Sequence, residues 1–198
     1  ASDATLLIDG LAYGAMPADV IQGLGHRIVA LVHHPLYLET GVEAGRRTEL
    51  LETERRALAL AAHVIVTSRS TERIVAGDLG VAADRITVAE PGTDPAPRAT
   101  GTGMPLQLLT VGAVSQRKAY TDLVEALAPL ADLDWRLTIA GALDRDADAV
   151  AGLRERIADH GLGERIHLPG AVVPATLDRF YGSADVFVMP SLFEGYGM

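Results

Sequence analysis

The stretch "LQLLTVGAVSQRKAYTDLVEAL", from Leu106 to Leu127, contains a complete βα unit. Its first six residues, Leu106–Val111, form an apolar run that is typical of a buried strand. Gly112 follows where a tight turn is needed, and an apolar stripe with i, i+3, i+4, i+7 spacing begins at Tyr120. A strand, a glycine turn and an amphipathic helix in this order predict one repeat of an α/β fold with a parallel sheet.

The same alternation of short β-branched runs and helical patterns extends to both ends of the chain. Most of the runs are apolar at every position, which is typical of parallel strands covered on both faces. The expected strands are Thr5–Ile8, Arg27–Val32, Val64–Thr67, Ile86–Ala89, Leu106–Val111, Arg136–Ile139, Ile166–Leu168 and Asp185–Met189. Expected helices include a long one over Gly45–Ala62, whose charged residues form a solvated face, and one through Val150, Leu153 and Ile157.

One stretch, Ala89–Pro105, interrupts this alternation. It holds four Pro and three Gly and almost no apolar residue beyond Ala, which is typical of a linker. We therefore expect a first domain over residues 1–92, a linker over 93–105 and a second domain over 106–198.

Composition excludes several classes of function. The net charge is −9 with 17 Lys and Arg and no basic run, which argues against nucleic-acid binding. Cys is absent, so disulfides, thiolate metal sites and Cys nucleophiles are excluded. No apolar run approaches the roughly 20 residues that span a bilayer, and the chain opens without a signal-peptide pattern. A soluble cytoplasmic protein is the default expectation, and no segment indicates peripheral membrane contact.

Two cations, Arg117 and Lys118, stand just before the expected helix at Tyr120. Cations at a helix N-terminus oppose its dipole, so they fit better if an anion such as phosphate lies between them and the helix amides. The alternative is a pair of exposed loop cations, which is common on any surface.

The last expected strand runs into "PSLFEGYGM", with Glu194 beside Gly195 and Gly197. The glycines free the backbone to point N–H groups at an anion. A carboxylate beside that anion suits sugar hydroxyls, because an ionised carboxylate only accepts hydrogen bonds. The alternative is that Glu194 is a helix-start carboxylate favoured by the helix dipole.

Adjacent His33 and His34 follow the strand Arg27–Val32, and on an extended chain their side chains point to opposite faces. One can therefore line a cleft while the other packs. Two adjacent His with no third ligand make a weak metal site. A hydrogen-bonded structural His and a ligand-facing His both remain open at this point.

Taken together, the strand ends of the second half offer cations, amides, Gly turns that admit a flat ring, and a carboxylate, which are the needs of a nucleotide-sugar. The stretches that carry a family resemblance are "VIVTSRSTERIV", "ITVAEPGTD", "LLTVGAVSQRKAYTDLVEAL", "LTIAG", "ERIHLPGAV" and "ADVFVMPSLFEGYGM". In these stretches the chain resembles the retaining glycosyltransferases of group 1, family 4. That resemblance implies the GT-B fold, in which two Rossmann-like parallel-sheet domains each contribute to the site.

The resemblance also implies roles for particular residues. Glu194 would hold hydroxyls of the donor sugar, and His33 would reach the reacting sugar. The donor diphosphate would be bound by Arg117, Lys118 and the turn at Gly112. The amides of Gly195, Tyr196 and Gly197 would complete the phosphate site, and Ala171 and Val172 would border the base. Transfer from the nucleotide-sugar to an acceptor hydroxyl would retain the anomeric configuration and need neither a metal nor a further cofactor.

The chain departs from the family pattern at three points. Ala113 stands where the family often has Arg, and Ala119 where Gly often follows the Lys. The second Glu of the family's Glu–x7–Glu pair would fall four residues after Met198. We therefore expect an internal fragment of a longer enzyme, with both domains incomplete and the fragment itself inactive or crippled.

Two other functions stay open at this stage. One is a sugar-nucleotide epimerase of the same architecture, which the linker and the closing motif match less well. The other is a non-catalytic nucleotide-binding or assembly module that uses the fold alone. Hydrolase motifs are absent, and Ser68 after the strand Val64–Thr67 is interpreted as a helix cap.

Overall fold

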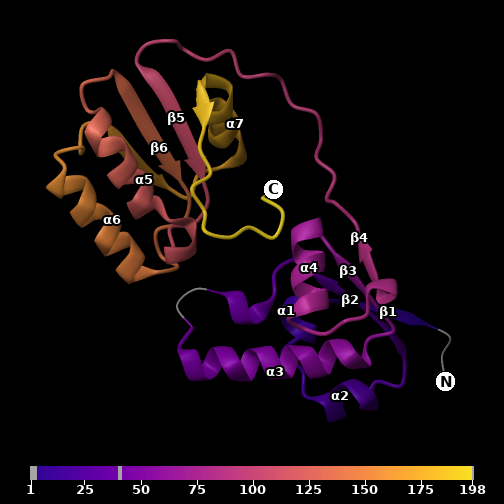
Figure 1. Cartoon of the computed structure of the whole chain (residues 1–198). Helices are drawn as coiled ribbons and strands as arrows, with labels where there is room; N and C mark the ends of the chain where they lie inside the picture. Colours follow the sequence, from indigo (N-terminus) through magenta and orange to yellow (C-terminus); the bar gives the residue numbers. More distant parts are fainter. Residues whose placement is uncertain (1–3, 40–41, 198) are drawn as a thin grey trace. The chain divides into compact units, whose positions relative to one another are not determined.

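A computed structural model describes residues 4–39 and 42–197 of the chain. By contact the chain divides into two compact units, which we describe separately (Figure 1). Unit 1 comprises Ala1–Thr93 together with Glu194–Met198, and unit 2 comprises Asp94–Phe193. Each unit has its own parallel four-stranded sheet and its own apolar core. The expected α/β fold with two Rossmann-like units is therefore confirmed.

Unit 1 is built on a sheet with the strand order β1-β2-β3-β4, in which every neighbouring pair is parallel. Its strands are β1 (Thr5–Asp9), β2 (Arg27–Val32), β3 (His63–Val66) and β4 (Ile86–Val88). Its helices are α1 (Gly10–Tyr13), α2 (Ala18–Gly23), α3 (Ala44–Leu60) and α4 (Arg69–Gly77), with 3₁₀ turns η1 (Leu36–Leu38) and η2 (Ala83–Arg85).

The core of unit 1 lies on one face of this sheet. Ile28, Ala30 and Val32 alternate along β2 and are all buried. They share one cluster with Leu58 of α3 and Val75 of α4. The intervening residues of β2 are partly exposed, so the expectation of strands covered on both faces is wrong for the described part of this unit. The reason is topological: each successive strand is added on the same side, and right-handed crossovers then place all the helices on one face.

Unit 2 has the strand order β7-β6-β5-β8, again with every neighbouring pair parallel. Its strands are β5 (Leu106–Val111), β6 (Trp135–Ala140), β7 (Ile166–Gly170) and β8 (Val186–Phe187). Its helices are α5 (Tyr120–Leu127), α6 (Ala147–Asp159) and α7 (Pro174–Ser183), with 3₁₀ turns η3 (Gln116–Lys118) and η4 (Ala128–Leu130).

The helices of unit 2 cover the sheet unevenly. The chain steps outward from β5 to β6 to β7 and then returns to the far side of β5 for β8. Right-handed crossovers therefore place α5 and α6 side by side on one face and α7 on the other (Figure 1). The main core packs α5 and α6 against Leu137 and Ile139 of β6. In contrast, α7 contributes no buried residue.

All eight expected strands are present, and most of their bounds differ by one or two residues from the expected ones. The largest difference is β8, which is shorter than the expected Asp185–Met189, although Asp185 still donates its N–H to the Gln107 carbonyl at 2.9 Å. The carboxylate of Asp185 accepts the amides of Gln107, Gly103 and Thr102 at 2.7, 3.1 and 2.9 Å. These bonds tie the end of the expected linker to unit 2, and they lower the pKa of Asp185.

The helix starts follow local side-chain chemistry. Ser68 caps α4, and its Oγ accepts the amide of Thr71 at 3.0 Å, which confirms its interpretation as a helix cap. Asp146 caps α6 in the same way through the amide of Ala149. Among the described residues, no helix has the length and apolar character required to cross a membrane.

Candidate functional site

The carboxyl edge of the unit 2 sheet carries a row of glycines. Gly112 follows β5, Gly141 follows β6 and Gly170 ends β7. Gly112 donates its N–H to Ala140 at 2.9 Å, and Gly141 donates to Gly170 at 3.0 Å. A Cβ at Gly141 would overlap the carbonyl oxygen of Gly112. The three strand ends therefore pack backbone on backbone, which leaves a surface that a flat group can approach closely.

Lys118 lies over the first of these glycines. A Cβ on Gly112 would stand 2.9 Å from Cε and 3.2 Å from Nζ of Lys118. The same Cβ would stand 2.9 Å from the hydroxyl of Tyr120, which donates to the Gly112 carbonyl at 3.2 Å. Gly112 also has φ of 152°, in the range that favours glycine. The sequence therefore needs glycine here so that the ammonium can lie over the end of β5.

Arg117 has different surroundings from its neighbour. Its Nη1 donates to the carbonyl of Phe193 at 2.8 Å, and its own carbonyl accepts the amide of Leu192 at 2.9 Å. These two bonds join the turn before α5 to the segment after β8. Both cations were expected to bind the donor diphosphate. In the structure Arg117 contacts the main chain of Phe193, and Lys118 lies over Gly112.

Ala171 and Val172 follow Gly170 at the same edge of the sheet. Gly170 has φ of 76°, which turns the chain sharply at the end of β7. Ala171 is exposed and Val172 is half-buried. Both side chains are apolar, and neither carries a charge to this edge of the sheet.

The end of the predicted closing motif, Glu194–Gly197, groups by contact with unit 1, whereas the part up to Phe193 belongs to unit 2; Met198 lies outside the described residues. Gly195 accepts a bond from Thr71 Oγ1 at 3.2 Å through its carbonyl. A Cβ at Gly195 would overlap the carbonyl oxygen of His33, so glycine is required for this approach. Glu194 is half-buried, and Tyr196 is 41% exposed. The main chain of the motif therefore lies directly against the turn that carries His33.

His33 faces a carboxylate that the sequence analysis did not single out. Its Nε2 lies 3.4 Å from Oδ2 of Asp9, and both side chains are about half exposed. Oδ1 of Asp9 accepts the amide of Leu11 at 2.9 Å and caps α1, which fixes the carboxylate. The neighbouring His34 is largely buried and lies 3.7 Å from Glu39. The side chains of the two His therefore differ in exposure, as predicted: His33 is exposed and His34 is packed.

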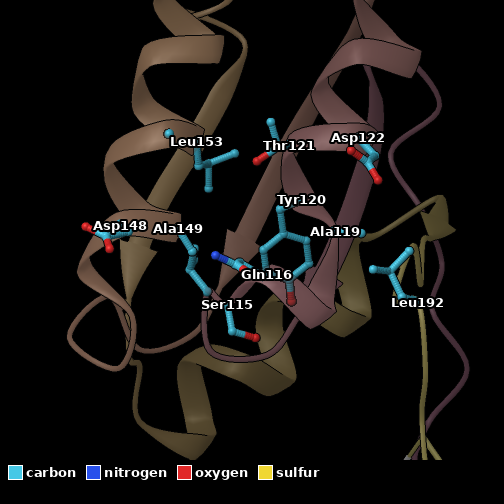
Figure 2. Close-up of a pocket in the computed structure, with 12 residues that line it drawn as sticks. Ser115, Gln116, Ala119, Tyr120, Thr121, Asp122, Asp148, Ala149, Leu153 and Leu192 are labelled. Carbon is cyan, nitrogen blue, oxygen red and sulfur yellow. The ribbon is translucent and has the colours of Figure 1, made fainter. Parts of the chain in front are cut away.

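A separate cavity of about 390 Å³ lies between the first turns of α5 and α6. Figure 2 shows Asp122 and Leu192 on the α5 side, Asp148 on the α6 side and the ring of Tyr120 between them. Neither Gly112 nor Lys118 lines it, so it is distinct from the glycine edge. Among residues 4–39 and 42–197, no group of three or more His, Asp or Glu has the arrangement of a metal site.

Comparison with known proteins gives the family. The profile described as "Glycosyl transferases group 1" matches residues 96–198, which is more than half of the chain. A second profile, "Glycosyltransferase Family 4", matches residues 6–97. The chain belongs to the group 1 glycosyltransferases. The resemblance that the motifs carry is thereby confirmed.

Curated relatives of this glycosyltransferase chain share about a third of its residues. The D-inositol 3-phosphate glycosyltransferase of Pseudarthrobacter chlorophenolicus is 33% identical over 183 residues, covering 82% of this chain and 42% of the relative. The GDP-mannose:cellobiosyl-diphosphopolyprenol alpha-mannosyltransferase of Xanthomonas campestris is 33% identical over 178 residues, covering 83% and 44%. The chain therefore spans less than half the length of these relatives.

Solved structures share the fold at low sequence identity. Sucrose-phosphate synthase of Thermosynechococcus elongatus superposes with a TM-score of 0.78 at 21% identity, covering 98% of this chain and 52% of that one. HepE of Anabaena, in complex with UDP and glucose, gives a TM-score of 0.77 at 18% identity, covering 96% and 54%. These enzymes have the GT-B fold, so the fold class expected from the resemblance is confirmed.

Proposed function

We propose that this glycosyltransferase chain binds a nucleotide-sugar and serves the transfer of its sugar to an acceptor hydroxyl. Retention of the anomeric configuration and independence of metal are part of the proposal. The acceptor is a hydroxyl of a glycan, lipid or small molecule.

The observation that carries the proposal is the position of Lys118 over the glycine edge. The lysine ammonium lies within reach of the Gly112 turn, at the carboxyl end of β5. Ligands of open α/β sheets bind at that edge. A diphosphate there would contact the Lys118 ammonium and the glycine main chain, and Ala171 and Val172 would border the base. HepE of Anabaena, which shares the fold, is a UDP and UDP-glucose complex in its solved structures.

The remaining roles follow the family motif. Glu194 would hold hydroxyls of the donor sugar, and the amides of Gly195, Tyr196 and Gly197 would bind phosphate. His33, exposed beside Asp9, would face the reacting sugar. Arg117 would support the site by holding the Phe193 carbonyl as well as by its charge. No cofactor beyond the donor substrate is needed for these roles.

Calorimetric titration of the chain with UDP-glucose, GDP-mannose and the free nucleotides tests donor binding. We expect Lys118→Ala to weaken binding of the preferred nucleotide-sugar by roughly tenfold or more, since a charge-assisted bond to phosphate is lost. Arg154→Ala is the matched control, because it removes an exposed cation from α6 of the same unit. Equal affinity of Lys118→Ala and the wild-type chain would overturn the proposed phosphate site.

Sugar transfer separates a transferase from a non-catalytic nucleotide-binding module. In the full-length enzyme, Glu194→Ala is expected to lower the rate of transfer by orders of magnitude, because sugar hydroxyls lose their acceptor in the transition state. A module that only binds nucleotide would be indifferent to this change. Product anomers read by NMR, with and without EDTA, check retention and metal independence in the same assay.

A further inference from the structure

A buried acid in unit 1 has no part in the function described so far. Glu54 lies in α3, and only 1% of its surface is exposed, although most charged residues of that helix face solvent. One carboxylate oxygen, Oε2, accepts the amide of Leu36 at 2.9 Å. The other, Oε1, has no hydrogen-bond partner within the described part of the chain. Burying a carboxyl group costs free energy of desolvation, so a buried acid is expected to have a specific structural or functional role.

The bond to Leu36 completes the turn that follows His33 and His34. The 3₁₀ turn η1 spans Leu36–Leu38 and starts after Pro35, which provides no side-chain cap. The first amides of such a turn need an acceptor. Glu54, 18 residues further along the chain, supplies it from α3. Burial raises the pKa of Glu54 to about 7, and bonds from the amides of Leu36 and Tyr37 act in the opposite direction.

Glu54 also touches the segment on the other side of His33. A Cβ on Gly14, just after α1, would stand 3.1 Å from Cγ of Glu54 and 3.0 Å from Cδ1 of Leu36. The same short helix begins at the Asp9 cap, whose second oxygen faces His33. The segments that follow β1 and β2 therefore both contact this one acid.

The far end of the turn is fixed as well. The hydroxyl of Tyr37 donates to the carboxylate of Asp78, just after α4. The guanidinium of Arg55, next to Glu54 on α3, donates to the carbonyl of Asp78 at 2.7 Å. With this end anchored, the Glu54 bond fixes the start of the turn, and Thr67 Oγ1 donates to the His33 carbonyl at 3.4 Å just before it.

We propose that Glu54 is a positioning residue, which holds the Pro35–Leu38 turn against α1 and so orients the imidazole of His33 toward Asp9. Its importance for sugar transfer rests on the proposed function, because His33 is the group that would face the donor sugar. The geometric part of the proposal does not depend on any ligand.

NMR spectroscopy of the chain tests this without substrate. Glu54→Leu removes the acceptor at nearly constant volume, Glu54→Gln keeps an acceptor oxygen, and Glu49→Leu is a matched control at an exposed site of α3. We expect hydrogen-exchange protection of the Leu36 and Tyr37 amides to fall roughly tenfold or more in Glu54→Leu, since each loses its partner. We also expect the ring resonances of His33 to move toward those of an Asp9→Asn variant.

Glu54→Gln should retain the wild-type His33 resonances, and Glu49→Leu should leave both readouts unchanged. If Glu54→Leu lowers amide protection but leaves the His33 ring resonances in place, the acid is only structural and the positioning role fails. Glu54→Asp, whose shorter side chain cannot reach both amides, replaces Glu54→Leu if that variant does not fold. Absence of nucleotide-sugar binding by the wild-type chain would overturn the proposed function and leave these two readouts unaffected.

Discussion

At the scale of single residues, Ala119 occupies a position where the family pattern often has Gly, and its backbone conformation is strained. Ala119 has φ of 51° and ψ of 36°, which is the left-handed region, and it is the only non-glycine residue with positive φ in the described ranges 4–39 and 42–197. It separates Lys118 from the start of α5 and is 6% exposed. A left-handed conformation costs a non-glycine residue about 1 kcal/mol or more, which explains why the family often has Gly at this position.

Substitution of Ala119 is expected to reveal this strain. Ala119→Gly should change the free energy of unfolding of unit 2 by less than about 1 kcal/mol, because relief of strain offsets the buried methyl group. Ala119→Val should lower it by roughly 2 kcal/mol, since a β-branched residue is poorly tolerated at positive φ. In the exposed helical control, Ala126→Gly should cost about 1 kcal/mol and Ala126→Val less. Urea denaturation measures the free energy of unfolding of all four variants. If glycine lowers it equally at positions 119 and 126, the strain at Ala119 is contradicted.

Other residues of the candidate site differ in how far the sequence predicts them. The contrast between His33 and His34 follows from strand alternation, and the need for Gly112 follows from the turn after β5. Asp9 and Glu54 were missed because their importance comes from contacts across 24 and 18 residues, and the local sequence of Glu54 does not distinguish it from the other acids of α3. Asp9 carries one weak local signal, since it ends a strand and precedes a helix start.

At the scale of elements, the sequence predicts where the strands lie along the chain. It does not predict which face of each sheet the helices cover. Apolar runs and glycine turns predict all eight strands, because a parallel strand must be short, apolar and bounded by turns. The same runs cannot tell which face is covered, since that depends on strand order. The order β1-β2-β3-β4 places the helices of unit 1 on one face, and the return to β8 in unit 2 places α7 on the second face.

The ends of β5 and β6 lie so close together that the residue after β6, Gly141, has no room for a side chain. Gly141→Ala would place a methyl group on the carbonyl of Gly112, so we expect it to lower the free energy of unfolding of unit 2 by roughly 3 kcal/mol. It should also weaken nucleotide-sugar binding, because the glycine edge must shift. Gly152→Ala is the matched control, since its added methyl meets nothing within 4 Å and α6 gains helix propensity of up to about 1 kcal/mol. Calorimetric unfolding measures both variants. If Gly141→Ala and Gly152→Ala change the free energy of unfolding with the same sign, the packing of the strand ends is contradicted.

At the scale of the whole molecule, two units with separate cores imply two unfolding transitions that can be assigned by mutation. The acid at position 54 should give the unit 1 transition a pH dependence of its own. Its pKa is about 7 in the folded chain against an ordinary value of 4.5, so the folded state binds the proton more tightly than the unfolded state.

The sign of this dependence follows from proton binding. Between about pH 4.5 and 7 the folded state holds a proton at Glu54 that the unfolded state has released, so raising the pH over this window lowers the free energy of unfolding. A difference of that size in pKa corresponds to at most about 3 kcal/mol. Glu54→Gln mimics the protonated acid and should lose this contribution to the slope, while the unit 2 transition should be the same in both proteins. Denaturation at several pH values measures the difference, and a slope of unit 1 that is identical in Glu54→Gln and the wild type would show that Glu54 does not titrate in this window.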